Sequence, residues 1–219
     1  WQPPIDLNDT TGAYFKRLAA ISPPAQAQRY RDVVSGDARA MAAADAWLRA
    51  NEPRHASMLR TSISPNIVQG GYRNNVIPSE ARATLDVRMR PGEDAEAFRT
   101  ELERLIGDTQ VEVVFNGYGR RPPGVPAALD NEAFVAIERA IREHYAAPVI
   151  PMMGNGATDM AFLRAKGMQC YGVGPAVDQE DGPLGFGAHS DQERILEQEL
   201  YRFVRFHYDA VARLAGAAP

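Results

Sequence analysis

Cysteine is almost absent from the chain, which has a single one, Cys170, among 219 residues. One thiol cannot form a disulfide within the chain, and it cannot build a zinc site from cysteine ligands. Cys170 lies in the apolar run MQCYGVG, which favours a buried strand thiol over a reactive nucleophile. The cysteine content therefore excludes a disulfide framework and a cysteine-based metal site.

A basic surface and a long apolar run are also missing. The net charge is -4 and the pI is about 5.6, whereas proteins that bind a nucleic-acid backbone need a basic face. No apolar run approaches the roughly 18 residues of a membrane span, and no segment reads as a signal peptide. We therefore expect no nucleic-acid partner and no membrane partner, and the sequence leaves the localisation open.

Two common site motifs are lacking as well. No serine lies in a G-x-S-x-G elbow, so the nucleophile of an α/β-hydrolase triad is excluded. The segment GNGATD at 154–159 lacks the lysine and the spacing of a phosphate-binding loop. A nucleotide site is therefore not expected.

The chain does contain enough apolar sequence for a core, since hydrophobic residues make up 45% of it. Helical spacing of apolar residues predicts helices over 10–21, 25–50, 91–107, 131–145, 159–165 and 191–214. Strand-like patterns predict strands in SMLRTSISPNIVQGG, ARATLDVRMR, VEVVF, APVIPM and MQCYGVG.

The order of these elements predicts two different layers. Helix, strand, strand, helix and strand over 1–115 predict a small antiparallel sheet with helices on one face, like a ferredoxin-like layer without its first strand. After the Pro- and Gly-rich segment NGYGRRPPGVPAALD, strands that alternate with helices predict an α/β layer over 116–219. The expected class is α/β with an α+β first domain.

His189, in GFGAHSDQERI, is a candidate metal ligand. A neutral imidazole on a glycine-containing loop is well placed to bind a metal, and Gly185 and Gly187 let the backbone pass close to a ligand. The alternative is a segment that caps the following helix through Ser190 or Asp191, with His189 merely nearby. The local sequence leaves both interpretations open.

Two other segments carry candidate binding residues. Arg88 ends a predicted strand, and its planar guanidinium suits a carboxylate, whereas an exposed edge arginine is the alternative. Asn75 lies in the turn that precedes this strand. In GNGATD, backbone N–H groups around Gly156 suit an anion, and the alternative is a tight turn with Thr158 or Asp159 as the helix cap.

Taken in order, GGYRNNVIPSEARATLDVRMRPG, GNGATDMAFL and GFGAHSDQERI resemble the second half of the M20 family of metallopeptidases. That family includes the carboxypeptidase G2, succinyl-diaminopimelate desuccinylase, aminoacylase and Gly-Xaa carboxypeptidase types. The resemblance implies an α/β catalytic domain interrupted by a four-stranded lid domain that often mediates dimers. On this basis, residues 1–115 are the lid or dimerisation domain without its first strand, and residues 116–219 are the C-terminal part of the catalytic domain.

The resemblance also implies roles for single residues. His189 matches a ligand of a two-metal centre, usually zinc, and Glu193 matches the acid that follows this histidine. Asn75 and Arg88 match residues that bind the carbonyl and the carboxylate of the substrate. Gly156 and Thr158 match residues that line the substrate pocket.

One departure from the family is large. Its members carry an H-x-D, a bridging Asp and a Glu-Glu pair ahead of the lid, but this sequence has no adjacent Glu-Glu pair and its H-x-D at His189 lies at the other end. A zinc ion needs at least three protein ligands. No catalytic residue is therefore assigned in this chain, and the two zinc ions of the parent active site are not expected to be fully bound by it.

These observations lead to two functional hypotheses. In the first, the chain is part of a zinc-dependent M20-type exopeptidase or amidohydrolase that cleaves an amide next to a free carboxylate in a peptide or N-acyl amino acid, and the chain alone is inactive. It begins with Trp1, which predicts a processed product, an engineered form or a piece of a longer protein. In the second, it is a non-catalytic dimerisation or binding module with the lid fold. A homodimer through the lid is expected.

Overall fold

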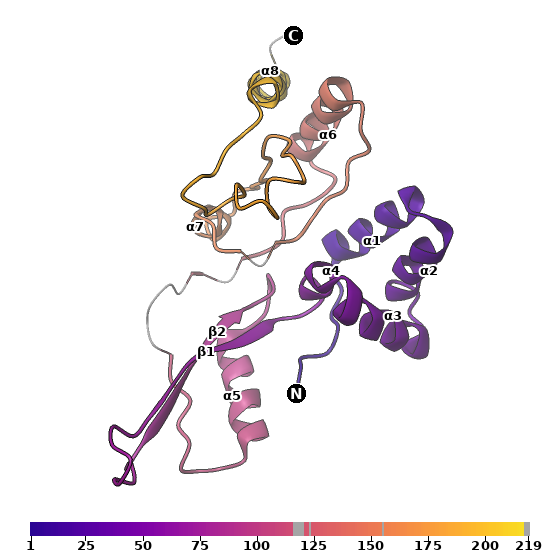
Figure 1. Ribbon diagram of the computed structural model, residues 1–219. Helices are drawn as coiled ribbons and strands as arrows, with labels where there is room; N and C mark the ends of the chain where they lie inside the picture. The colour runs from indigo at the N-terminus through magenta and orange to yellow at the C-terminus, as the bar shows by residue number, and fades with distance from the viewer. Residues whose placement is uncertain (116–120, 123, 155, 217–219) are drawn as a thin grey trace. The chain divides into compact units, whose positions relative to one another are not determined.

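The computed structural model describes residues 1–115, 121–122, 124–154 and 156–216, which form two units. The first unit comprises Trp1–Pro126 and Ile150–Met168, and the second comprises Ala127–Val149 and Gln169–Pro219. The chain therefore passes from the first unit to the second, back, and again to the second. Helices and a small sheet occur together (Figure 1), which confirms the expected mixed class.

Four helices open the first unit: α1 (Asp9–Ile21), α2 (Pro24–Val33), α3 (Ala38–Asn51) and α4 (Pro53–Ser57). Asn8 caps α1, because its side chain accepts from the Thr11 amide at 2.9 Å while the Thr11 hydroxyl accepts from the Asn8 amide. The helix therefore begins at Asp9, one residue ahead of the expected position 10. The single helix expected over 25–50 is divided, because Gly36 has φ 78° and Asp37 caps α3.

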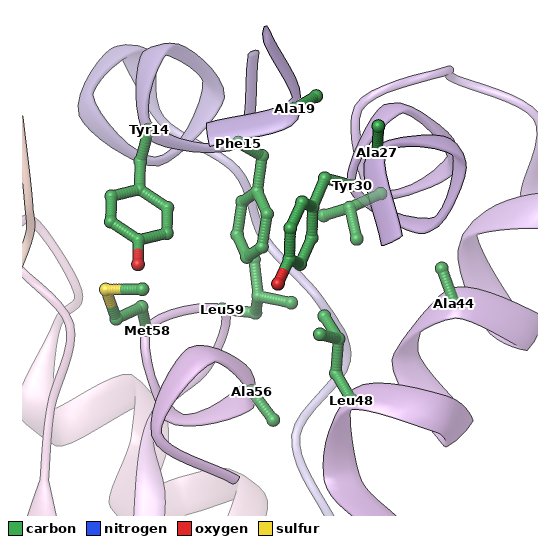
Figure 2. Close-up of a cluster of buried hydrophobic side chains, with 11 residues drawn as sticks. Tyr14, Phe15, Ala19, Ala27, Tyr30, Ala44, Leu48, Ala56, Met58 and Leu59 are labelled. Carbon is green, nitrogen blue, oxygen red and sulfur yellow. The ribbon is translucent and has the colours of Figure 1, made fainter. Parts of the chain in front are cut away.

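The core of this unit lies between the four helices (Figure 2). Phe15 and Leu48 are 0% exposed, and Tyr14, Tyr30 and Met58 pack around them. Truncation of such a fully buried apolar side chain typically costs about 2–5 kcal/mol of unfolding free energy. This core includes side chains that recur at helical spacing along α1, namely Tyr14, Phe15 and Leu18.

A hairpin and one helix follow: β1 (Ser62–Gly70), β2 (Ala81–Arg88) and α5 (Ala95–Ile106). The two strands are antiparallel, with Ser62 opposite Arg88 and Gly70 opposite Ala81. An irregularity between Pro65 and Ile67 shifts the register by one residue, as expected where a proline cannot donate to the ladder. The pairing brings Arg88 to the base of the hairpin, at the end opposite the connecting turn.

Helix α5 agrees closely with the sequence. The Asp94 side chain accepts from the Ala97 amide at 2.8 Å at its start, and Gly107 ends it in a left-handed conformation with φ 63°. Among the apolar residues of α5, Phe98 is buried and contacts Trp1, with ring centroids 6.5 Å apart. Leu105 and Ile106 of the same helix are exposed.

Three expected strands are corrected by the structure. Within the described residues, strand pairing joins β1 and β2, and VEVVF, APVIPM and MQCYGVG have no strand conformation. A strand is stabilised by a partner strand beside it, so an alternating or apolar pattern without a paired neighbour remains irregular. Val114 is accordingly 66% exposed, and Cys170 is only partly buried instead of lying in a buried strand. The described sheet has two strands, where the resemblance implies four.

Two long helices form the frame of the second unit: α6 (Glu132–Tyr145) and α8 (Glu197–Leu214). They pack through Ala140, Phe206 and Ala210, with Phe203 stacked on Phe206 at 5.8 Å between ring centroids. Helix α8 begins six residues later than the expected position 191, because turns precede it. In one of these turns the Glu193 amide donates to the Ser190 carbonyl at 3.1 Å. The short helix α7 (Met160–Arg164) belongs to the first unit.

Candidate functional site

Arg88 lies at the C-terminal end of β2, where its guanidinium reaches water. Its Nη2 donates to Asp86 Oδ2 at 2.8 Å, and the side chains of this pair are 46% and 38% exposed. A side chain two residues back on a strand lies on the same face of the sheet, so Asp86 reaches the guanidinium without distorting the strand. An incoming carboxylate would compete with Asp86 for Arg88.

Asn75 lies in the turn between the strands and is exposed. Beside that turn, residues 69–72 and 78–82 line an open hollow of about 420 Å³. Arg82 lines this hollow and pairs with Glu80 at 3.1 Å, whereas Arg88 is at the other end of the ladder. The hairpin therefore separates the two predicted substrate contacts along its length, and the described bonds of Arg88 run to its own strand.

The turn ahead of α7 holds the second predicted segment. Thr158 is partly buried, and its hydroxyl accepts from the Met160 amide at 3.4 Å. Its carbonyl accepts from the Ala161 amide at 3.2 Å. Gly156 is exposed, and a Cβ atom at that position would meet nothing within 4 Å. The N-cap of α7 is Asp159, which makes no side-chain capping bond, and Thr158 precedes it in the turn. The role of this turn in a pocket stays a prediction.

His189 lies in the second unit, on the loop between residues 175 and 196, and is exposed. Its backbone has φ 68°, a left-handed conformation that only one other described non-glycine residue, Ala146, adopts. Such a conformation is uncommon for residues other than Gly, and among these residues Asn, Asp and His adopt it more often than the rest. The His189 amide donates to Glu193 Oε2 at 3.3 Å. Glu193 thus contacts the backbone of His189, and the path of the loop sets the direction of the imidazole.

Strain of this kind costs roughly 1–3 kcal/mol and persists where the surroundings hold it. The same loop contains an ion pair and an aromatic ring that contacts it. Arg194 donates to Asp181 Oδ1 from Nε at 2.9 Å and from Nη2 at 2.6 Å, and its guanidinium lies 4.0 Å from the centroid of the Phe186 ring. The hydrogen bonds that Arg194 donates to Asp181 raise the pKa of Arg194 above its usual value. No local sequence pattern indicates this pair, because its members lie thirteen positions apart in the chain.

The other three histidines pack against rings or pair with carboxylates. His55 lies in α4, with Nδ1 2.6 Å from Glu52 Oε2 and its ring in edge contact with those of Tyr14 and Tyr30. His144 Nε2 lies 3.2 Å from Asp209 Oδ2. His207 contacts the Phe203 ring at 4.4 Å.

A second H-x-D pattern, His207 and Asp209, lies within α8. Residues two apart on a helix point about 200° apart around its axis, so this pair does not converge on one ion. Asp209 instead accepts from Arg213 Nε at 2.8 Å, and this bond, with the help of His144, holds the pKa of Asp209 below its usual range. The pattern is structural.

The capacity of these side chains for a metal is small. In the part of the chain that the structure describes, no three His, Cys, Asp or Glu side chains gather closely enough to hold an ion. No described helix is both long and apolar enough to cross a membrane. His189 with Glu193 offers at most the beginning of a ligand set.

Comparison with known proteins connects these features. Residues 26–114 match the peptidase dimerisation domain of the M20 family. Over 150 residues, the chain is 28% identical to succinyl-diaminopimelate desuccinylase of Stenotrophomonas maltophilia, which covers 68% of this chain and 37% of that protein. It is 27% identical over 158 residues to aminoacylase-1B of Rattus norvegicus, which covers 71% of this chain and 37% of that protein.

A third similar protein is the N-fatty-acyl-amino acid synthase/hydrolase of Xenopus tropicalis, with 24% identity over 161 residues, or 73% of this chain and 31% of that protein. The matched region thus spans about a third of the length of these curated relatives. No solved structure matches the chain.

Proposed function

We propose that the chain, whose residues 26–114 match the peptidase dimerisation domain of the M20 family, is part of a metallohydrolase of that type. The reaction is hydrolysis of an amide bond next to a free carboxylate. The names of the three similar proteins share one substrate chemistry, an acyl group on the nitrogen of an amino acid. An N-acyl amino acid is therefore the substrate class, and a peptide presents the same amide and carboxylate.

The observation that carries the proposal is the exposed Arg88 within the matched dimerisation domain. A guanidinium recognises a carboxylate through paired, charge-assisted hydrogen bonds. Its present partner, Asp86, is a carboxylate itself and lies at the surface, so a substrate carboxylate can replace it at low cost. In this proposal Asn75 binds the substrate carbonyl, and Gly156 and Thr158 line the pocket.

His189 is proposed as a ligand of a two-zinc centre. A zinc ion needs at least three protein ligands, and the described residues do not gather three such groups. The chain by itself therefore does not fit the metal pair, and the remaining ligands and the proton-transferring acid must come from other polypeptide. By this reasoning the chain alone does not turn over substrate.

A second candidate is a dimerisation or binding module without catalysis. The observation that favours it is that the matched family domain is the dimerisation domain itself. Such a module forms a homodimer, as the proposed enzyme also does, but has no need to distinguish a carboxylate from an amide.

Ligand binding separates the two candidates. The chain is titrated with an N-acetyl amino acid and, in parallel, with the same compound as its C-terminal amide, and binding is followed by NMR. The hydrolase proposal expects the free carboxylate to bind more tightly and to shift signals of the hairpin near Arg88. Equal binding of the two compounds, or binding of neither, contradicts it and leaves the module.

A further inference from the structure

Within the loop that carries His189, one ion pair closes the segment 181–194. Asp181, at the start of this segment, is only 6% exposed, and Arg194, at its end, donates two hydrogen bonds to one oxygen of that carboxylate. Arg194 lies three residues ahead of α8, which packs on α6. The pair therefore ties Asp181 to a residue just ahead of α8. Helix α8 is itself held in place by its packing on α6.

Additional contacts tighten the same closure. The Phe186 amide donates to the Asp181 carbonyl at 2.8 Å, and the Phe186 carbonyl accepts from the Arg194 amide at 3.3 Å. The Phe186 ring lies under the Arg194 guanidinium at 4.0 Å, a cation–π distance. Phe186, in the middle of the loop, thus contacts both Asp181 and Arg194.

The backbone between Phe186 and His189 is tightly confined. A Cβ atom on Gly187 would lie 3.1 Å from the Cα atom of Gly182, closer than ordinary contacts. The Ser190 amide donates to the Gly187 carbonyl at 3.3 Å. Two residues after Gly187, His189 takes up its left-handed conformation. The close approach at Gly187 leaves the chain little freedom to turn His189 elsewhere.

We propose that Asp181 and Arg194 are positioning residues for His189: their ion pair, covered by Phe186, holds the loop so that the imidazole points outward in its strained conformation. That this imidazole then binds a metal rests on the proposed function. The positioning itself does not, because every contact that carries it lies within the chain.

The physical asymmetry of the pair explains why the loop depends on it. The side chain of Asp181 is 9% exposed, whereas the side chain of Arg194 is 55% exposed. Removing the arginine leaves a buried charge without its partner, which is far more costly than removing a surface charge. Opening of the loop would bring the Asp181 carboxylate into water and relieve that cost, so we expect the loop to open and His189 to lose its left-handed conformation.

The test compares Arg194→Gln, Asp181→Asn and Arg194→Lys in the full 219-residue chain without added metal. Arg202→Gln is the matched control, because Arg202 also combines a carboxylate, Glu199 at 3.3 Å, with an aromatic ring, Tyr145 at 5.5 Å, but lies on α8. Two quantities are measured: hydrogen exchange of the amides of residues 182–193, and the NMR signals of the His189 imidazole, assigned with His189→Gln.

We expect exchange in the loop to become at least about tenfold faster in Arg194→Gln and Asp181→Asn, since a hydrogen bond to a charged group contributes that much. The His189 signals should move toward those of an unstructured histidine. Arg194→Lys, which restores the charge but not the paired hydrogen bonds, should give an intermediate result. Arg202→Gln should leave both quantities unchanged.

Unchanged loop exchange and unchanged His189 signals in Arg194→Gln would overturn the proposal. If Arg194→Gln unfolds α6 and α8 as well, Arg194→Lys decides: a folded variant with wild-type His189 signals overturns the proposal, and shifted signals support it. Because both readouts use the metal-free chain, a later finding that His189 binds no metal would refute its proposed role and leave the positioning result intact.

Discussion

Removing one charge beside Arg88 should strengthen carboxylate binding, and removing Arg88 should weaken it. Asp86 occupies the guanidinium in the free chain, at 2.8 Å and at the surface. In Asp86→Asn this internal competitor is neutral. A ligand carboxylate then gains the arginine without displacing another anion.

The magnitudes follow from the exposure of the pair. A charge-assisted contact to a carboxylate contributes about 1.5–3 kcal/mol. The exposed pair with Asp86 contributes about 0.2–1 kcal/mol, which is lost when the ligand binds. The net preference for the acid over its amide is therefore about 0.5–3 kcal/mol, or roughly twofold to 150-fold. Asp86→Asn should tighten binding of the acid by up to about fivefold.

The assay is a titration of wild-type chain, Asp86→Asn and Arg88→Gln with an N-acetyl amino acid and its amide. Arg88→Gln should abolish the difference between the two ligands. Arg82→Gln is the control on the same hairpin, since Arg82 also pairs with an acid two residues earlier, Glu80. An equal loss for acid and amide in Arg88→Gln, or a loss confined to Arg82→Gln, would refute the assignment of Arg88 as the carboxylate anchor.

Three further outcomes are expected. The chain mixed with excess Zn²⁺ should not hydrolyse N-acyl amino acids, and turnover that a chelator abolishes would contradict this. Tyr30→Phe should lower the unfolding free energy of the first unit by about 1 kcal/mol, because the Tyr30 hydroxyl donates to Glu52 at 2.8 Å; denaturation followed by fluorescence of Trp1 and Trp47 measures it, and an unchanged midpoint would count against that bond. Arg213 depresses the pKa of Asp209, so its stabilisation is present above the unfolded carboxyl pKa of about 3.9 and is lost as pH falls through the depressed value; amide exchange in α6 and α8 should accelerate there in wild type but much less in Asp209→Asn.

Helices could be predicted from the sequence where capping residues and apolar spacing agree. Helix α5 has Asp94 ahead of it, Phe98 facing inward and Gly107 behind it, and each of these signals is local. The hairpin was also predictable, because both strands alternate and are joined by a turn. The division of 25–50 into α2 and α3 depended on the left-handed Gly36, a single-residue signal that helical spacing alone does not reveal.

The wrong strand predictions have a common physical cause. VEVVF and MQCYGVG contain strand-forming residues, but a strand is stabilised by hydrogen bonds to a neighbour that the local sequence does not specify. Within the described residues these segments have no such neighbour. The division into a lid domain over 1–115 and a catalytic part over 116–219 remains a prediction. The two structural units divide the chain differently, because Ile150–Met168 belongs to the first unit.

The candidate site could be predicted only residue by residue. Arg88 and His189 stand out because each has a distinctive side chain at the end of a strand or on a loop. What the sequence could not show is their partners: Asp86 next to Arg88, and the Asp181–Arg194 pair that closes the loop of His189. The pairing of Asp181 with Arg194 depends on the path of the chain between them, which no local pattern encodes.

The mass of the chain in solution tests the central assignment, a dimerisation domain of the M20 type, most directly. A two-stranded sheet has two open edges, and open edges associate unless they are blocked; Val68 on β1 is 76% exposed. Light scattering should report twice the chain mass of 24.0 kDa. Val68→Lys should shift the protein toward the monomer, whereas the control Val135→Lys, at a 51% exposed position on α6, should not. A wild-type monomer that persists at high concentration would contradict the assignment.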